Sequence, residues 1–204
     1  MRRIGLDFDN TIICYDDVFL SAAKERGLLS RDFSGTKQAV RDAIRALPDG
    51  EIAWQKLQGF VYGKGIGGAK AFDGFASFMK RAQASGDELI IVSHKTEYGH
   101  FDPERVNLRQ AALDWMRGQR FFGADGFGIA IENIYFESTR AEKLRRIAAT
   151  NCELFVDDLE EVLSDPDFPK TVDRILFSDR PVAAEAAPYK VCAGWPAVEE
   201  VIFA

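Results

Sequence analysis

The sequence is poor in the side chains that build soft metal sites and covalent cross-links. Its 204 residues include two histidines and three cysteines. Cys14, Cys152 and Cys192 are far apart and odd in number, which argues against a disulfide framework and indicates a reducing compartment. His94 and His100 have no cysteine nearby, so a zinc site is not expected.

The chain also lacks an excess of positive charge and any long apolar run. Lys and Arg number 26 against 32 Asp and Glu, for a formal net charge of −6. This balance argues against a broad nucleic-acid or anionic membrane surface. No run approaches the ~18 apolar residues of a membrane span, and Asp7 and Asp9 interrupt the first apolar run, so no signal peptide is expected. We therefore expect a cytoplasmic protein without nucleic-acid or membrane partners. The sequence indicates no particular oligomeric state.

The stretch from Ile4 to Thr11 (IGLDFDNT) has the most distinctive chemistry. An apolar run leads to Asp7, and Asp9 follows two residues later. Alternate residues of an extended chain point to the same side, so both carboxylates leave the strand end on one face. A cation would offset their repulsion, and oxygen ligands without Cys or His favour a hard ion such as Mg²⁺. Taken alone, the pair is better explained as a solvated turn after a strand, and only the further residues described below favour a site.

Residues 16–70 show helical periodicity without strand alternation. Helices are predicted at about 16–27, 36–47 and 51–62. The following segment, 63–68 (GKGIGG), matches the GxGxxG pattern of dinucleotide loops. Because it follows a helix and not a strand, we interpret it as a flexible hinge and not as a nucleotide site.

From Phe72 onwards helices alternate with strands. Strands are predicted at 2–9, 88–93, 129–136, 153–156 and 174–177. Helices are predicted from 72 to about 86, at 104–118, after the capping box 139–142 and at 159–163. This alternation implies right-handed crossovers and an α/β fold with a doubly wound, parallel, Rossmann-like sheet.

Polar residues follow several of these strands at one edge of the predicted sheet. Ligands of such sheets bind beyond the carboxyl ends of the strands. The residues at this edge are Asp7 and Asp9 after the first strand, Ser93 after the second, Lys143 in the first turn of the helix after the third, and Asp157 and Asp158 after the fourth. Each alone has an ordinary explanation, such as a helix cap or a surface lysine, but their shared position favours a site.

The chemistry that needs this set of groups is phosphoryl transfer. A carboxylate can attack phosphorus in line while a divalent cation neutralises the phosphate. A lysine and a hydroxyl can bind the remaining phosphoryl oxygens. A second carboxylate can protonate the leaving oxygen and later activate water.

The order and context of these residues resemble the four motifs of the haloacid dehalogenase-like superfamily. The resemblance covers about residues 1–15 and 71–180 and rests on DFDNT at 7–11, IVS at 91–93, Lys143 and VDD at 156–158. It implies that Asp7 is a nucleophile forming an aspartyl-phosphate, that Asp9 is the general acid/base, and that Lys143 orients nucleophile and phosphate. The pair His94–Lys95 after Ser93 departs from the family pattern.

The resemblance also implies ligands for phosphate and metal. Thr11 and Ser93 would hold phosphate, and Asn10 and His94 are assigned beside them to substrate binding. The implied ligands of Mg²⁺ are Asp7, the backbone carbonyl of Asp9, and Asp158, with Asp157 acting directly or through water.

The position of Asp9 narrows the expected activity. Dehalogenases of the superfamily lack an acid there, whereas phosphatases and mutases have one. We therefore predict a Mg²⁺-dependent phosphatase acting on a small phosphorylated metabolite. The alternatives are a phosphotransferase or phosphomutase using the same aspartyl-phosphate chemistry, or a non-catalytic binding module, which would not need Asp9. Residues 16–70 are similar to the superfamily's type 1 cap, so the predicted domains are an α/β core, 1–15 and 71–204, and a small all-helical cap, 16–70.

Overall fold

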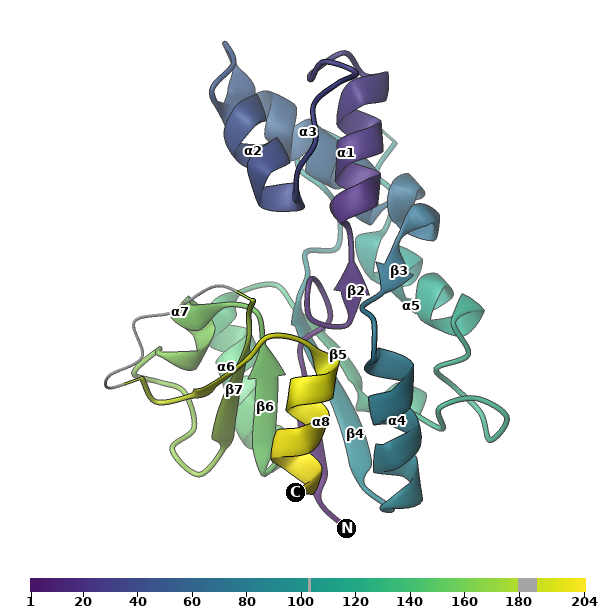
Figure 1. Ribbon diagram of the computed structural model, residues 1–204, viewed down its shortest axis with the longest axis vertical. Coiled ribbons are helices and arrows are strands. Elements are labelled where there is room, and N and C mark those ends of the chain that lie inside the picture. The colour runs from purple at the N-terminus through teal and green to yellow at the C-terminus, as the bar shows by residue number, and fades with distance from the viewer. Residues whose placement is uncertain (103, 180–186) are drawn as a thin grey trace. The chain divides into compact units, whose positions relative to one another are not determined.

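A computed structural model describes residues 1–102, 104–179 and 187–204, and its contacts divide the chain into two compact units (Figure 1). The first, here called the sheet unit, comprises Met1–Ile13, Ala71–Lys95 and Arg120–Ala204. The second, the helical unit, comprises Cys14–Lys70 and Thr96–Gln119. Each unit is described by itself.

The sheet unit is built on a six-stranded sheet in which every neighbouring pair is parallel. The spatial order is β5-β4-β1-β6-β7-β8. The chain therefore winds outward from β1 in both directions, which confirms the predicted doubly wound parallel sheet. The strands are β1 (Arg3–Leu6), β4 (Glu88–His94), β5 (Ile134–Glu137), β6 (Leu154–Asp157), β7 (Asp173–Phe177) and β8 (Lys190–Cys192).

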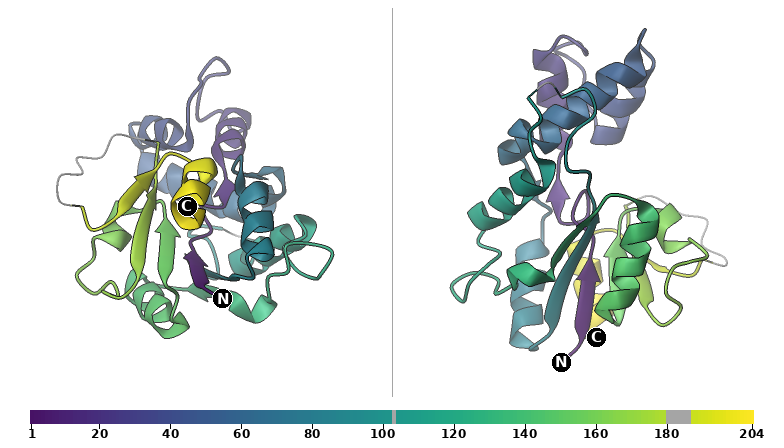
Figure 2. Two further views of the ribbon diagram at one scale, coloured as in Figure 1. Left: turned by 60° about the horizontal axis from the view of Figure 1, so that its bottom comes forward. Right: turned by 180° about the vertical axis from the view of Figure 1, so that it is seen from behind.

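Helices cover both faces of this sheet (Figures 1 and 2). On one face lie α4 (Phe75–Ala84) and α8 (Trp195–Phe203), and on the other lie α6 (Arg140–Thr150) and α7 (Glu160–Leu163). Ile90 and Val92 of β4 join a core cluster with Leu144 of α6. On the opposite face the ring of Trp195 lies 4.9 Å from that of Phe75. Burial on both faces explains why the strands are continuously apolar.

The helical unit contains the three helices predicted within 16–70: α1 (Asp16–Glu25), α2 (Lys37–Arg45) and α3 (Gly50–Tyr62). Phe19 and Trp54 stack in its core with ring centroids 4.8 Å apart. The 3₁₀ helix η1 (Lys64–Gly68) follows α3, and α5 (Leu108–Gly118) joins the same unit, where the Trp115 indole donates to the Ala69 carbonyl. Strands β2 (Ile13–Cys14) and β3 (Lys70–Ala71) pair with each other.

Residues 96–119 make their contacts within the helical unit. The sequence pattern had assigned them to the α/β core. The proposed core and cap boundaries stay a prediction. Within the described residues, no helix combines the length and apolar character needed to cross a bilayer.

Several element boundaries differ from the predicted ones. The first strand ends at Leu6, and the strand predicted at 129–136 begins only at Ile134, because the 3₁₀ helix η2 (Ile131–Asn133) precedes it. The helix predicted at 104–118 begins at Leu108, where Asn107 accepts a hydrogen bond from the Gln110 amide as its N-cap. Strand β8 and helix α8 were not predicted. The signal for α8 was Pro196 in its first turn.

Candidate active site

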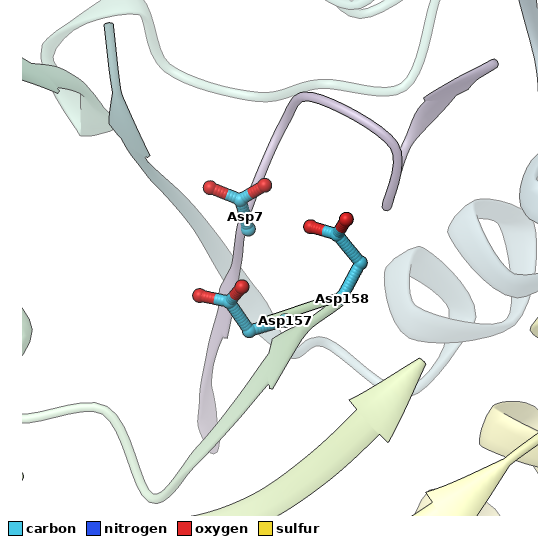
Figure 3. Close-up of side chains that lie close together, drawn as sticks. All are labelled: Asp7, Asp157 and Asp158. Atoms are coloured by element: carbon cyan, nitrogen blue, oxygen red, sulfur yellow. The ribbon is translucent and has the colours of Figure 1, made fainter. Parts of the chain in front are cut away.

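Three carboxylates gather where β1 and β6 end side by side. Leu6 pairs with Val156 in the parallel register, and the Asp7 amide donates to the Val156 carbonyl at 2.8 Å, so Asp7 lies beside Asp157. Asp158 follows directly. Figure 3 shows the three side chains together at this edge. Each offers one oxygen that lies within 4.8 Å of the others. The structure thus brings together three of the four acids predicted for the site.

Lys143 of α6 joins two of these carboxylates. Its Nζ donates to Asp7 Oδ1 and to Asp157 Oδ2, at 2.6 Å in both cases, and its side chain is 1% exposed. The predicted capping box fixes the start of α6, since Thr139 Oγ1 accepts from the Glu142 amide. A buried ammonium is tolerated only with such charged partners. Lys143 therefore lies at the sheet edge of Asp7 and Asp157, as its place in the first turn of the helix predicted.

The electrostatics of this cluster favour a cation. Burial raises the pKa of Asp7 well above its usual value, and the nearby charges of Asp157 and Asp158 raise it further, against the opposing effect of Lys143. Burial alone would lower the pKa of Lys143, but Asp157 and Asp7 outweigh it and raise that pKa. One ammonium thus accompanies three carboxylates.

The donor set also fits a hard divalent ion. Carboxylate oxygens are the ligands that Mg²⁺ prefers, and the spacing of the three acids lets them share one ion. Asp157 already uses both of its oxygens, since Oδ2 accepts from Lys143 and Oδ1 accepts from the Leu159 amide at 3.0 Å. Its carboxylate is held firmly in place by these two contacts.

Thr11 and Ser93 place two buried hydroxyls in the same unit. Their residues are 0% and 1% exposed, and neither hydroxyl has a hydrogen-bond partner among the described residues. Ser93 lies at the sheet edge of Asp7, because β1 and β4 pair through Leu6 and Ile91. An unpaired buried hydroxyl costs roughly 1–3 kcal/mol, so a hydrogen bond to either group would be stabilising.

The turn after β1 holds Thr11 and redirects the chain. The Ile12 amide donates to the Phe8 carbonyl, and the Trp195 indole donates to the Thr11 carbonyl at 3.0 Å. Asn10 has a φ of 61°, a left-handed conformation that asparagine tolerates better than most residues. This backbone role explains Asn10 without a ligand, and its predicted part in substrate binding stays a prediction.

His94 ends β4 with an exposed side chain. Its Nε2 lies 3.0 Å from the Ser138 carbonyl oxygen, just before α6. The contact positions the ring against a loop of the sheet unit. A role for His94 in substrate binding likewise stays a prediction.

Lys95 is the site residue that sequence reasoning missed. Its Nζ lies 3.0 Å from Asp9 Oδ1 and 2.8 Å from Asp9 Oδ2, and its side chain is 3% exposed. A lysine directly after a strand is usually solvated, so its burial could not be expected from periodicity. The only available signal was the polar pair His94–Lys95, which follows an otherwise apolar strand.

Comparison with solved structures supports the fold described above, whereas comparison of sequences assigns the chain to no family. No protein-family model and no curated protein matches the chain. Many solved structures match it over nearly the full length of both chains, and three of them are given as examples. A haloacid dehalogenase-like family hydrolase from Streptococcus pneumoniae is 14% identical, with a TM-score of 0.61 over 100% of this chain and 98% of that chain. A predicted phosphatase from Clostridium acetobutylicum is 13% identical, with a TM-score of 0.58 over 99% and 98%.

The third structure, Protein Tyrosine Kinase A from Mycobacterium tuberculosis, is 14% identical, with a TM-score of 0.66 over 100% of this chain and 98% of that chain. At these identities the likeness concerns architecture. The chain has the fold of the haloacid dehalogenase-like hydrolases, as its four motifs predicted.

Proposed function

We propose that the protein is a Mg²⁺-dependent phosphatase that hydrolyses a small phosphorylated metabolite through an aspartyl-phosphate on Asp7. The observation that carries this proposal is the pair of buried hydroxyls of Thr11 and Ser93, which have no partner among the described residues. A phosphate group at the sheet edge of Asp7 would give the Ser93 hydroxyl a partner, and we assign the Thr11 hydroxyl to the same group. The Lys143 ammonium, 2.6 Å from Asp7, would bind a further phosphoryl oxygen.

The reaction follows from the two carboxylates that leave β1. An oxygen of Asp7 attacks phosphorus, the ester O–P bond breaks, and Asp9 gives a proton to the leaving oxygen. Asp9 then takes a proton from a water molecule as that water attacks phosphorus, which releases phosphate and restores Asp7. Lys143 keeps the Asp7 carboxylate oriented during both steps, and Asp157 keeps Lys143 in place.

The metal would lie among the acids that the fold gathers. Asp7, the backbone carbonyl of Asp9, and Asp158 are the proposed ligands, with Asp157 acting directly or through water. A bound Mg²⁺ would neutralise the charge of the phosphate group.

A panel of phosphorylated metabolites, assayed for phosphate release with Mg²⁺ and with a chelator, tests the proposal. We expect at least one small ester to be hydrolysed only when Mg²⁺ is present, and the Asp7→Asn variant to be inactive on it. Undiminished release after thorough chelation, or full activity of Asp7→Asn, would contradict the proposal.

A second candidate is transfer of the same phosphoryl group to a hydroxyl of another molecule, as in a phosphotransferase or mutase. A protein of similar fold, Protein Tyrosine Kinase A from Mycobacterium tuberculosis, bears the name of a phosphoryl-transfer enzyme. Mass spectrometry distinguishes the two, because transfer yields a newly phosphorylated acceptor in place of inorganic phosphate.

A further inference from the structure

The buried ion pair between Lys95 and Asp9 has no part in the mechanism above. We infer that Lys95 is a positioning residue that sets the orientation of the Asp9 carboxylate and keeps it separate from the cation-binding acids. This inference rests on the proposed function, because it concerns the acid/base step of that reaction.

The geometry of the pair restricts the motion of Asp9. Lys95 Nζ is within 3.0 Å of both carboxylate oxygens, so it constrains the side-chain torsions of Asp9. The Asp9 side chain is 17% exposed and therefore retains some access to a reacting group.

Lys95 itself is anchored at both ends. Its backbone amide donates to the Glu137 carbonyl at 2.9 Å, which continues the ladder between β4 and β5. Its Nζ lies 5.8 Å from the centroid of the Phe8 ring, the residue between Asp7 and Asp9. Because the Lys95 ammonium is fixed in this way, it can fix the orientation of the Asp9 carboxylate that it contacts.

The two buried lysines of the site, Lys143 and Lys95, contact different carboxylates. Lys143 contacts Asp7 and Asp157, which belong to the group that could share a cation. Lys95 contacts Asp9, whose carboxylate is not in that group. By engaging both oxygens of Asp9, Lys95 holds this carboxylate apart from the acids that could share a cation and fixes its orientation.

The test uses the dependence of the rate on the leaving group. An alkyl phosphate needs a proton on its leaving oxygen more than an aryl phosphate does, because its alcohol is the weaker acid. We expect Lys95→Met to lower turnover of an alkyl phosphate on the order of 10²-fold, the usual effect of a misplaced catalytic group. Turnover of p-nitrophenyl phosphate should fall far less. Lys95→Arg, which keeps the charge, should give an intermediate loss with the same preference.

A double-mutant cycle shows whether Lys95 acts through Asp9. In the Asp9→Asn background, Lys95→Met should change neither rate by more than about threefold, because the group that Lys95 positions is already lost. Calorimetry should show that Lys95→Met still binds Mg²⁺ at least as tightly as the unmodified protein. Lys80→Met, which removes an exposed lysine of α4 in the same unit, is the matched control and should leave all values unchanged.

Equal losses on both substrates, losses that add to those of Asp9→Asn, or wild-type rates in Lys95→Met would overturn the inference. Should Lys95→Met fail to fold, Lys95→Arg supports the same comparison, and a loss without leaving-group preference would again overturn it. If the unmodified protein hydrolyses no phosphate ester with Mg²⁺, the proposed function itself fails. That outcome is distinct from an active enzyme whose rate does not depend on Lys95.

Discussion

At the scale of single residues, Asp7 and Asp9 are two positions apart but have different partners. Asp7 is buried against Lys143, whereas Asp9 pairs with Lys95. We expect Asp7→Asn to lower turnover on the order of 10³-fold or more, because covalent attack is lost. Asp9→Asn should cost on the order of 10²- to 10⁴-fold, as for a lost proton transfer. Steady-state rates of folded variants measure both effects, and an Asp7→Asn variant with most of the activity would show the nucleophile to be another residue.

The two unpaired hydroxyls allow a prediction that separates function from stability. Replacing Ser93 by Ala or Thr11 by Val removes a buried hydroxyl that has no partner among the described residues. We therefore expect stability to be unchanged or raised by about 1 kcal/mol, while affinity for phosphate falls. Thermal unfolding with and without inorganic phosphate measures both. A marked loss of stability without phosphate would mean that the hydroxyls serve the fold and not a ligand.

Residues of the site were predictable where chain periodicity determines their position. Asp7 and Ser93 follow from where apolar strands end, and Lys143 follows from a capping box that fixes the start of its helix. Lys95 was not predictable, because its partner Asp9 lies 86 residues away in sequence and on another strand end. Only the packing of β1 beside β4 brings the two together.

At the scale of elements, the close approach of β6 to β1 depends on Gly5. A Cβ at this position would lie 2.4 Å from Phe155 Cδ2 and 3.1 Å from Cys152 Sγ. We expect Gly5→Ala to lower the free energy of unfolding by about 1–3 kcal/mol, because the ring of Phe155 must shift within a packed core. Chemical denaturation measures this change. Gly118→Ala is the control, since its Cβ would meet no described atom within 4 Å, and equal stability of both variants would contradict the packing.

The elements that could be predicted are those with a long periodic pattern. The helices at 16–27, 36–47 and 51–62 have one, and each is present. Strand β8 has three residues, and α8 lacks charged residues in its first turn, so neither had enough pattern for prediction. Element ends depend on individual contacts, such as the Asn107 cap of α5.

At the scale of the whole molecule, sequence order alone could not place 96–119. These residues lie between strands of the sheet, so alternation assigned them to the core. In the structure they belong to the helical unit, where the buried indole of Trp115 bonds to the Ala69 carbonyl. The order of helices and strands predicts a topology, but the grouping of helices into units depends on side chains that meet from distant segments.

The stability of the whole protein should respond to divalent ions. Asp7, Asp157 and Asp158 are within reach of one ion, and burial of excess negative charge opposes folding when no cation is bound. An ion that binds only the folded chain stabilises it, by about 2.7 kcal/mol at 100 times its dissociation constant. We expect both Mg²⁺ and Ca²⁺ to raise the melting temperature, and Asp158→Asn to reduce the effect, with NaCl at equal ionic strength as the control.

The rate of hydrolysis should nevertheless differ between the protein with bound Mg²⁺ and the protein with bound Ca²⁺. Ca²⁺ takes more oxygen ligands at longer distances than Mg²⁺ and would let Asp7 bind with both of its oxygens, which leaves neither to attack phosphorus. We expect Ca²⁺ to stabilise the protein and to inhibit hydrolysis of an aryl phosphate in competition with Mg²⁺. Melting curves and rates measured on the same samples compare the two effects directly. If Ca²⁺ supported turnover as well as Mg²⁺ does, Asp7 could not be both ligand and nucleophile.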